Sequence, residues 1–249
     1  KGAMRLLHVS DTHGTFPDLP AQDGLVVHTG DLLPNKTRGV LAVERHYQTS
    51  WLRRKLSRFK RWLAGRPFVY VAGNHDFIAP TEMLAASGVV AFDATHRCVE
   101  VGGLVFYGFP CVPFISGEWS HELDGAGLAE RTRELAALLV ERPVDVLLLH
   151  APPAGILDGL GGHFGSEPMA TLLARPDIRL PRAILCGHVH EAAGLTVLQG
   201  TSTLVSQAAT TVHSLMLPPC PSPSAPSSPA SEVSSLGSRP PGSDPSSGR

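Results

Sequence analysis

Short apolar runs and longer amphipathic segments alternate along most of the chain. Runs with the length of a buried strand occur at residues 6–9, 25–28, 68–71, 104–109, 144–149 and 183–186. Between some of these runs, apolar residues recur at spacings of three and four, which predicts helices at residues 40–63, 126–141 and 167–174. Short apolar strands that alternate with amphipathic helices indicate an α/β fold with a largely buried sheet.

The C-terminal part of the chain has two further kinds of pattern. Residues 195–217 contain runs of Thr, Val and Gln that are typical of antiparallel strands, so we expect a mixed sheet system. Residues 218–249 hold 11 Ser and 9 Pro and no aromatic residue. Such a segment cannot bury enough apolar surface to offset its loss of conformational entropy. We therefore expect one folded domain over 4–217 and a disordered tail over 218–249.

Charge and cysteine usage exclude several classes of function. The chain has 21 Lys and Arg against 22 Asp and Glu, so no global basic field favours stable binding of nucleic acid. The basic cluster at 53–61 falls within a predicted amphipathic helix, where we interpret it as the solvated face. The four cysteines show no Cys-x-x-Cys spacing, and no apolar run reaches membrane-spanning length. We expect a soluble cytoplasmic protein that does not contact membranes, and its oligomeric state stays open.

Side chains that can bind a metal follow five of the predicted strands. The segments are Asp11-Thr12-His13, Gly30-Asp31, Gly73-Asn74-His75-Asp76, His150, and Gly187-His188-Val189-His190. In open α/β sheets, ligands bind outside the carboxyl ends of the strands, so these side chains should converge on a single crevice. Each motif alone is weak or moderate, but the five in this order make coincidence improbable.

The composition of this crevice indicates a pair of metal ions. Apart from His75 and Asp76, it offers two Asp, one Asn and four His, with no thiolate, which suits Mn²⁺, Fe²⁺ or Zn²⁺. Seven ligands are too many for one ion, so two ions that share a carboxylate are the economical arrangement. The Gly before Asp31, Asn74 and His188 allows a sharp turn near an ion. If the segments are extended, each His-x-His or Asp-x-His pair places both side chains on one face.

The whole pattern from Asp11 to His190 resembles the calcineurin-like metallophosphoesterases. The resemblance implies a four-layer α-β-β-α sandwich of two mixed β-sheets, with a dinuclear metal site at the carboxyl ends of the strands. The ligands carried over are Asp11, His13 and His190 for one ion, Asn74, His150 and His188 for the other, and Asp31 as the bridge. His75 is then the catalytic histidine that faces the substrate.

A narrower resemblance lies in His-Ala-Pro-Pro-Ala-Gly-Ile-Leu-Asp at 150–158 and Gly-His-Phe-Gly at 162–165. These segments look like the MPPED-type branch, which is related to the class III cyclic-nucleotide phosphodiesterases. The branch implies small phosphodiester substrates such as cyclic nucleotides. Some animal members lack the first His of Gly-His-x-His, whereas His188 is present here, which favours an active enzyme. The cofactors expected are two divalent ions, with Mn²⁺ first and Fe, Zn, Ni or Mg as alternatives.

These residues suit hydrolysis by a metal-bridging hydroxide. Water held between two cations loses its proton near neutral pH, and the same ions neutralise the phosphoryl oxygens. We expect His75 to protonate the leaving alkoxide and Asp76 to orient or charge its imidazole. His163, in its Gly-rich loop, is a candidate substrate contact. His8 and His28 lie inside strands, where we interpret them as hydrogen-bonded core histidines and not as ligands.

The sequence favours diesters over monoesters. A terminal phosphate is a dianion that monoesterases of this superfamily grip with Arg, but Ala72 precedes Gly73 and no Arg directly follows Asp31. A diester needs fewer cations and a less polar rim, which Leu32, Leu33 and the 151–153 loop are expected to supply. The alternatives left open are a phosphomonoesterase, including a protein phosphatase, a nuclease, and lastly a non-catalytic scaffold of the same fold.

Overall fold

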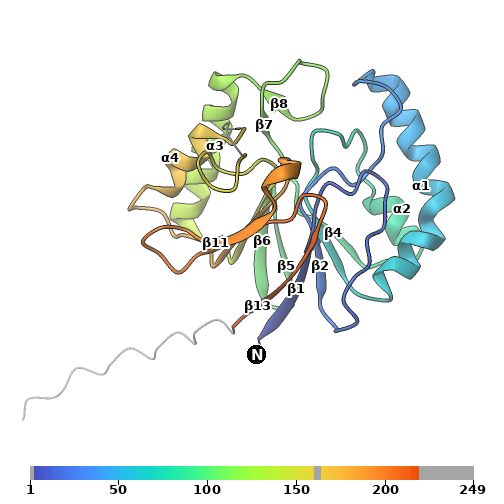
Figure 1. Ribbon diagram of the computed structural model, residues 1–249, viewed down its shortest axis with the longest axis horizontal. Coiled ribbons are helices and arrows are strands. Elements are labelled where there is room, and N and C mark those ends of the chain that lie inside the picture. The colour runs from blue at the N-terminus through green and yellow to red at the C-terminus, as the bar shows by residue number, and fades with distance from the viewer. Residues whose placement is uncertain (1–2, 160–163, 219–249) are drawn as a thin grey trace, which may run out of the picture. The chain divides into compact units, whose positions relative to one another are not determined.

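The computed structural model describes residues 3–159 and 164–218, which form four layers (Figure 1). Two large β-sheets pack face to face, and helices cover the outer face of each sheet. The α-β-β-α sandwich of two mixed sheets that the resemblance implies is therefore confirmed. His163 and residues 219–249 of the expected tail lie outside the described residues.

Within the described residues, the first sheet has five strands and is mostly parallel. Its order is β13 (Val212–Leu217), β1 (Met4–Val9), β2 (Leu25–His28), β3 (Phe68–Tyr70) and β4 (Ala91–Asp93). The strands from β1 to β4 form parallel pairs, whereas β13 pairs antiparallel with β1, with Val9 opposite Val212. The carboxyl ends of β1, β2 and β3 thus lie next to one another at one edge.

The second sheet, as far as the structure describes it, has six strands. They run in the order β11 (Gly194–Val197), β12 (Leu204–Gln207), β10 (Ala183–Cys186), β9 (Val146–Leu149), β6 (Leu104–Phe109) and β5 (Cys98–Val101). The central pairs are parallel, and β11 and β5 close the two edges as antiparallel strands. The sequence predicts antiparallel strands over 195–217; this is confirmed for the β11–β12 pair and for the pairing of β13 with β1, whereas on its other side β12 pairs parallel with β10.

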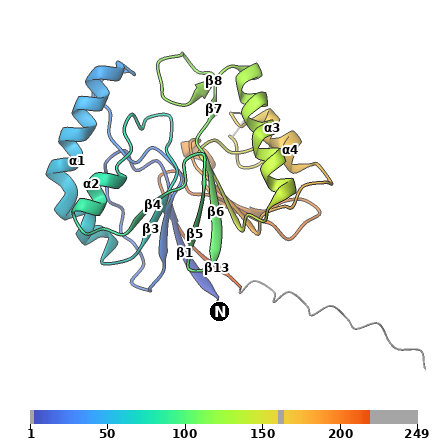
Figure 2. The same cartoon turned by 180° about the vertical axis from the view of Figure 1, so that it is seen from behind.

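The side chains of β9 point alternately to two buried faces, which explains why these strands are apolar throughout. Val146 and Leu148 point into the core between the two sheets, whereas Leu147 and Leu149 point to the opposite face. That outer face is covered by α3 (Gly125–Glu141) and α4 (Glu167–Leu173), as Figure 2 shows from behind. Because both faces of the sheet are buried, no position in β9 can be polar without a partner.

The long helix α1 (Leu41–Leu63) and the short α2 (Thr81–Ala86) cover the outer face of the first sheet. Leu52, Phe59 and Leu63 are buried against the sheet, whereas Arg53 and Arg54 are exposed. The interpretation of the basic cluster as the solvated face of a packed helix is therefore confirmed. None of the helices in the described residues is long and apolar enough to cross a membrane.

Candidate metal centre

Five strand ends meet at one edge of the sandwich. Asp11, Asp31 and Asn74 follow the neighbouring strands β1, β2 and β3 of the first sheet, and His150 and His188 follow the neighbouring strands β9 and β10 of the second. Because all five strands point the same way at this edge, their carboxyl ends place the side chains in one cluster. The structure thus brings together residues that are as far as 177 positions apart in the chain.

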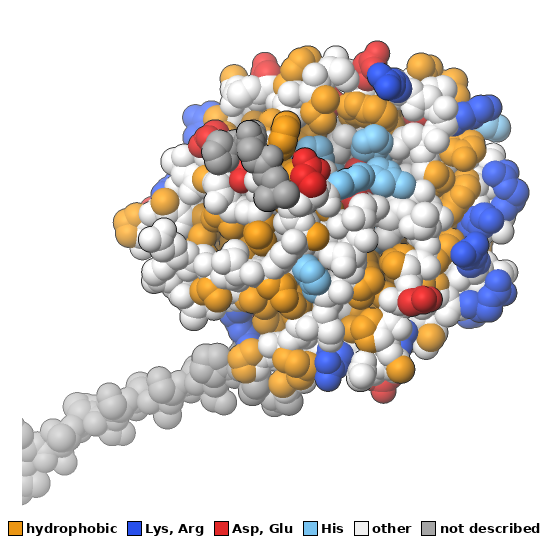
Figure 3. Space-filling view, viewed as in Figure 1, with side chains coloured by type: hydrophobic (Ala, Val, Ile, Leu, Met, Phe, Trp, Pro, Cys, Tyr) orange, Lys and Arg blue, Asp and Glu red, His pale blue; other side chains and the backbone are white. Residues whose placement is uncertain are grey.

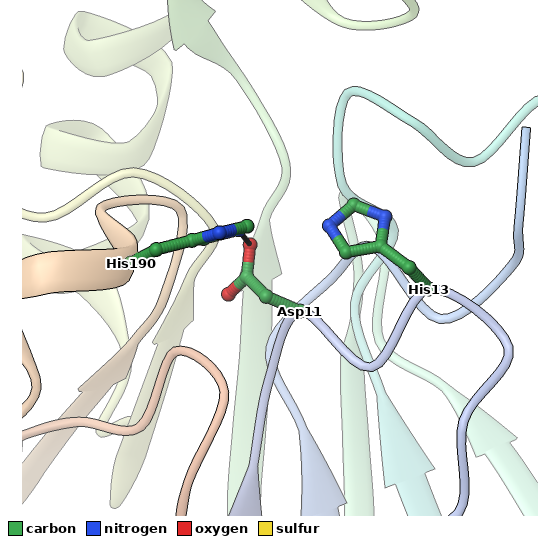
Figure 4. A group of neighbouring side chains, drawn as sticks. All are labelled: Asp11, His13 and His190. Carbon is green, nitrogen blue, oxygen red and sulfur yellow. Dashed lines mark ion pairs between the residues drawn. The ribbon is translucent and has the colours of Figure 1, made fainter.

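Asp11, His13 and His190 form the first group of possible metal ligands. One donor atom from each residue lies within 4.8 Å of the others. Figure 4 shows the two imidazoles on either side of the Asp11 carboxylate, with His190 Nε2 3.5 Å from Asp11 Oδ1. This Oδ1 is buried and has no hydrogen-bond partner among the described residues. An orphaned buried carboxylate oxygen beside two imidazoles is the donor arrangement that a cation would complete.

Asp31 lies at the centre of the cluster. Its Oδ1 is 3.4 Å from His150 Nε2, and its Oδ2 is 3.8 Å from His13 Nε2. Asp31 belongs to one possible ligand group with Asp11 and His150, and to another with His13 and His75. A carboxylate shared by two groups has the position that a bridging ligand needs.

His150 is oriented by a backbone contact behind the cluster. Its Nδ1 lies 2.8 Å from the carbonyl oxygen of Thr29, which can only accept, so Nδ1 carries a proton. The other nitrogen, Nε2, lies 2.9 Å from Asn74 Oδ1 at the centre of the site. The imidazole of His188 lies with its ring centre 5.0 Å from that of His150. Asn74 and His188 thus both lie next to His150, although the possible ligand groups among the described residues do not include His188.

The charges of the cluster favour a cation. Burial opposes ionisation of Asp31, but the neighbouring His150, His75 and His13 outweigh it and hold the pKa of Asp31 well below its usual range. The pKa of Asp11 is also lowered, since its contacts with His190 and His150 outweigh its burial. Burial likewise opposes the charged form of His150, yet the two carboxylates raise its pKa to about 9. Two buried carboxylates thus stay ionised and draw positive charge to the site.

The glycines before three of these residues are required by close packing, whereas from the sequence we expect them for sharp turns; of the three, only Gly30 has a positive φ. A Cβ on Gly73 would clash with the carboxylate and backbone nitrogen of Asp31, and one on Gly187 would clash with Ser10 and Asp11. Gly30 is equally crowded, because a Cβ there would meet the imidazole of His150. Any side chain at these positions would push a candidate ligand out of the cluster.

The backbone of the candidate ligands is not extended. Four of them adopt the left-handed region, with φ of 54° at Asp11, 43° at His13, 58° at Asp31 and 71° at His188. The expectation that Asp-x-His and His-x-His share a face of an extended segment is therefore wrong: the strands end first, and tight turns orient the side chains. Left-handed backbone costs a residue with a Cβ about 1 kcal/mol or more, so the fold holds these turns against local preference.

His75 faces the cluster but is not held by Asp76. The Nε2 atom of His75 lies 4.0 Å from Asp31 Oδ2, and its Nδ1 lies 2.7 Å from Asn35 Oδ1. The carboxylate of Asp76 instead accepts hydrogen bonds from the backbone N–H groups of Leu32, Leu33 and Gly73. The predicted contact between Asp76 and the His75 imidazole is thus wrong, because the carboxylate is used to join two turns of the site.

Two buried polar residues of α1 fix the turn that carries Asn35. Glu44 accepts hydrogen bonds from the backbone N–H groups of Lys36 and Thr37, and also from the Asn35 amide. Gln48, one helical turn later, contacts the carbonyl oxygen of His75 at 2.7 Å. Sequence reasoning missed both residues. Their signal was that they interrupt the otherwise apolar buried face of the helix.

The histidines inside β1 and β2 are core residues, as expected. His8 lies 2.8 Å from Ser206 Oγ and 3.0 Å from Thr29 Oγ1, and His28 lies 3.0 Å from Thr12 Oγ1. Burial is the main cause that lowers the pKa of both, in His28 to about 3. These neutral, hydrogen-bonded imidazoles support the strand ends from behind the cluster.

A cavity of about 600 Å³ opens over the cluster. One side consists of Asp31, Asn74, His75, His188 and His190, which we call the polar floor. The other consists of Phe114, Ile115, Trp119 and Phe164, which we call the apolar wall. Figure 3 shows the same character on the surface, where histidines gather in one place with hydrophobic side chains on both sides.

The apolar rim expected from Leu32, Leu33 and residues 151–153 is absent from this cavity. Leu32 is 3% exposed and Leu33 is fully buried, and both pack in the core under α1. Residues 151–153 are also buried. The apolar surface at the site comes instead from the loop between β7 (Val112–Pro113) and β8 (Glu122–Leu123), together with Phe164.

The sandwich and its cluster of Asp, Asn and His side chains define a metal-dependent phosphoester hydrolase. The chain belongs to the calcineurin-like phosphoesterase family, whose model matches residues 4–192. The family resemblance stated from the sequence motifs is thereby confirmed, and with it the expectation of divalent metal ions in an enzyme that hydrolyses phosphoric esters.

The curated relatives indicate which proteins this chain is similar to within the family. The chain is 26% identical over 243 residues to metallophosphoesterase domain-containing protein 1 of Homo sapiens, covering 85% of this chain and 68% of that protein. The same figures hold for the protein of that name from Mus musculus. A further match, 28% identical over 200 residues, is to a probable rhamnogalacturonate lyase C of Emericella nidulans, of which it covers 18%.

Proposed function

We propose that this chain is a metal-dependent phosphodiesterase that hydrolyses small phosphodiesters such as cyclic nucleotides. The observation that carries the proposal is the charge of the cavity: none of the described residues that line it is Lys or Arg. A monoester presents a dianion with three exposed oxygens, for which two metal ions alone offer too few partners. A diester has a single negative charge and therefore suits a site without guanidinium groups.

The proposal assigns the cluster to two divalent ions, with Mn²⁺ as the first choice. Asp11, His13 and His190 would hold one ion, Asn74, His150 and His188 the other, with Asp31 between them. When bound, the ions would lower the pKa of water and neutralise the phosphoryl oxygens. The donor set of carboxylate, imidazole and amide oxygen fits such ions, and the orphaned Asp11 Oδ1 supports it.

His75 is the proposed general acid. Its backbone N–H donates to Asp31 Oδ1 at 2.8 Å, so the residue is attached to the centre of the cluster. The contact with Asn35 occupies Nδ1 and leaves Nε2 directed at the cavity. Burial is the main cause that lowers the pKa of His75, which makes its charged form a stronger acid but a less populated one at neutral pH.

A direct comparison of substrates tests the proposal. The metal-free chain is reconstituted with Mn²⁺ and assayed on bis-p-nitrophenyl phosphate, p-nitrophenyl phosphate and cyclic nucleotides in one buffer. We expect a higher kcat/KM on the diester than on the monoester, and no turnover after chelation. A kcat/KM on the monoester that exceeds that on the diester tenfold would identify a phosphomonoesterase instead, and cleavage of oligonucleotides in preference to small diesters would identify a nuclease. The cytoplasmic location expected from the sequence stays a prediction.

A further inference from the structure

The apolar wall consists of side chains that a folded chain normally buries. Phe114 is 61% exposed, Ile115 52% and Phe164 56%, and all three line the cavity over the polar floor. Leaving large apolar groups in water forgoes the favourable free energy of burying them. Apolar groups gathered at a cavity mouth are typical of a binding surface.

The loop that carries most of this wall is held firmly in place. The Glu122 carboxylate accepts hydrogen bonds from the backbone N–H groups of Ser116, at 3.2 Å, and Gly117, at 2.5 Å. At the other end of the loop, the N–H of Ser120 donates to the carbonyl oxygen of Asn74 at 2.9 Å. The exposure of Phe114 and Ile115 is therefore built into the loop and does not follow from a lack of structure.

The loop also abuts the parts of the site that act on phosphate. The ring centre of Trp119 lies 4.0 Å from that of His75, at an interplanar angle of 37°. Gly39 packs so closely against Glu118 that a Cβ there would clash with the backbone of the loop. A phosphoester whose phosphorus lies over the polar floor can therefore place one of its ester arms along Trp119 and the apolar side chains next to it.

The charges at the cavity restrict what that arm can carry. Glu191 lies at the rim and is exposed, and the described lining residues include no Lys or Arg to balance a second anion. A further phosphate or carboxylate on the arm would meet a negative charge without a cationic partner. A nucleic-acid strand, with a phosphate on each side of the cleaved bond, would meet the same obstacle.

We infer that the apolar wall binds the retained arm of a singly charged phosphodiester, and that this arm is aromatic or otherwise apolar and carries no second negative charge. The inference rests on the proposed function, because it places the phosphodiester group over the polar floor. The inference adds the chemical class of the retained ester arm. It assigns the selection of that arm to Phe114, Ile115 and Trp119.

The test uses p-nitrophenyl diesters that share one leaving group and differ in the retained arm: methyl, phenyl or 4-carboxyphenyl. We expect Phe114→Ala to lower kcat/KM on the phenyl ester at least about tenfold more than on the methyl ester, since the burial of the phenyl arm against Phe114 is lost. Ratios between variant and parent cancel the intrinsic reactivity of each ester. Glu191→Gln should improve the carboxyphenyl ester relative to the phenyl ester.

A matched control separates selection from general damage. Val90 is 58% exposed and precedes β4, at the opposite end of that strand from the site, so Val90→Ala should leave the ratio between phenyl and methyl esters unchanged. Ile115→Ala should shift this ratio in the same direction as Phe114→Ala. Equal losses on both esters in the two wall variants would overturn the inference.

A binding measurement keeps this test independent of turnover. If the Mn²⁺-loaded chain hydrolyses none of the esters, the proposed function fails. Calorimetric titration with diphenyl phosphate and dimethyl phosphate still measures whether the apolar wall binds an aromatic arm. Tighter binding of diphenyl phosphate that Phe114→Ala reduces would support the inference. Equal affinities for the two phosphates would overturn it.

Discussion

The polar floor and the apolar wall face the same cavity but are built in opposite ways. The floor comes from the ends of strands in both sheets, and its central residues Asp31 and Asn74 are 2% and 1% exposed. The wall comes mainly from one loop, in which the backbone is fixed but Phe114 is 61% exposed. Bond cleavage needs donors held to within a fraction of an ångström, whereas recognition of an apolar arm needs only accessible surface. Changes in the floor should therefore act on turnover, and changes in the wall on the choice of substrate.

The largest effect is expected at Asp31, the residue of the polar floor that both groups of candidate ligands share. Asp31→Ala should remove metal binding and nearly all turnover, because this carboxylate contacts both groups of candidate ligands. The measurement is metal content per chain together with kcat/KM. Asp177→Ala is the control, since this exposed carboxylate pairs with Arg175 on the surface. Two ions per chain in Asp31→Ala would contradict the dinuclear assignment.

A smaller loss is expected at the floor residue that moves a proton. His75→Ala should retain the metal and lower kcat by roughly 10²–10⁴-fold, as is typical for a lost general acid. The loss should be smaller for a p-nitrophenyl ester than for an alkyl ester, because p-nitrophenolate leaves without a proton. Equal losses on the two esters would show that His75 acts through its charge and not by proton transfer.

Asn35 tests whether the floor depends on residues outside the cavity. Asn35→Ala removes the 2.7 Å contact to His75 Nδ1 and should lower kcat by roughly 10- to 100-fold through misplacement of the imidazole. KM and metal content should change little, which separates this effect from loss of the cluster. Asn35→Asp keeps an acceptor for His75 Nδ1 but loses the amide N–H groups that donate to Glu44 and to the carbonyl oxygen of His75, so it should recover only part of the rate. A similar loss in both variants would show that the donated hydrogen bonds, and not the acceptor, place the imidazole.

The mildest prediction concerns His8, which joins the two sheets behind the floor through Ser206 and Thr29. Burial is the main cause that lowers its pKa well below 6.5, so the folded chain keeps it neutral while the unfolded chain binds a proton below about pH 6.5. Its contribution to stability is therefore present above pH 6.5 and is lost as the pH falls, by up to about 1.4 kcal/mol per pH unit. Unfolding free energies in chelator should fall less steeply with acidification for His8→Asn than for the parent chain. Identical slopes would mean that His8 takes up its proton in the folded chain as well.

The sequence predicted the floor better than the wall, for a physical reason. Asp11, Asp31, Asn74, His150 and His188 each follow a short apolar strand, and the direction of parallel strands brings such ends together wherever they stand in the chain. The fold class followed from the same alternation of strands and helices. Local order along the chain was sufficient for these predictions.

The errors arose where contacts depend on side chains that are distant in the sequence. Asp76 is adjacent to His75, yet its carboxylate contacts Leu32 and Leu33, whereas Asn35, 40 positions away, contacts the imidazole. Phe114 and Ile115 lie in an irregular loop whose pattern has no period, so nothing in the sequence marked them as exposed. Leu32 and Leu33 were instead expected at the rim of the cavity because they directly follow Asp31 in the sequence. The structure shows that both are core residues.

The left-handed turns at Asp11, His13, Asp31 and His188 affect which substitutions this sequence can accept during evolution. Gly adopts the left-handed region with less strain than Asp or His does. The substitutions that most easily relax the backbone at these turns are therefore the ones that delete a candidate ligand. Asp11 and Asp31 also accept hydrogen bonds from the backbone N–H groups of His188 and His75, so folding itself opposes their replacement. At His13 and His188 a relaxed backbone would come with a loss of chemistry, so selection on turnover is what would keep these two side chains in place.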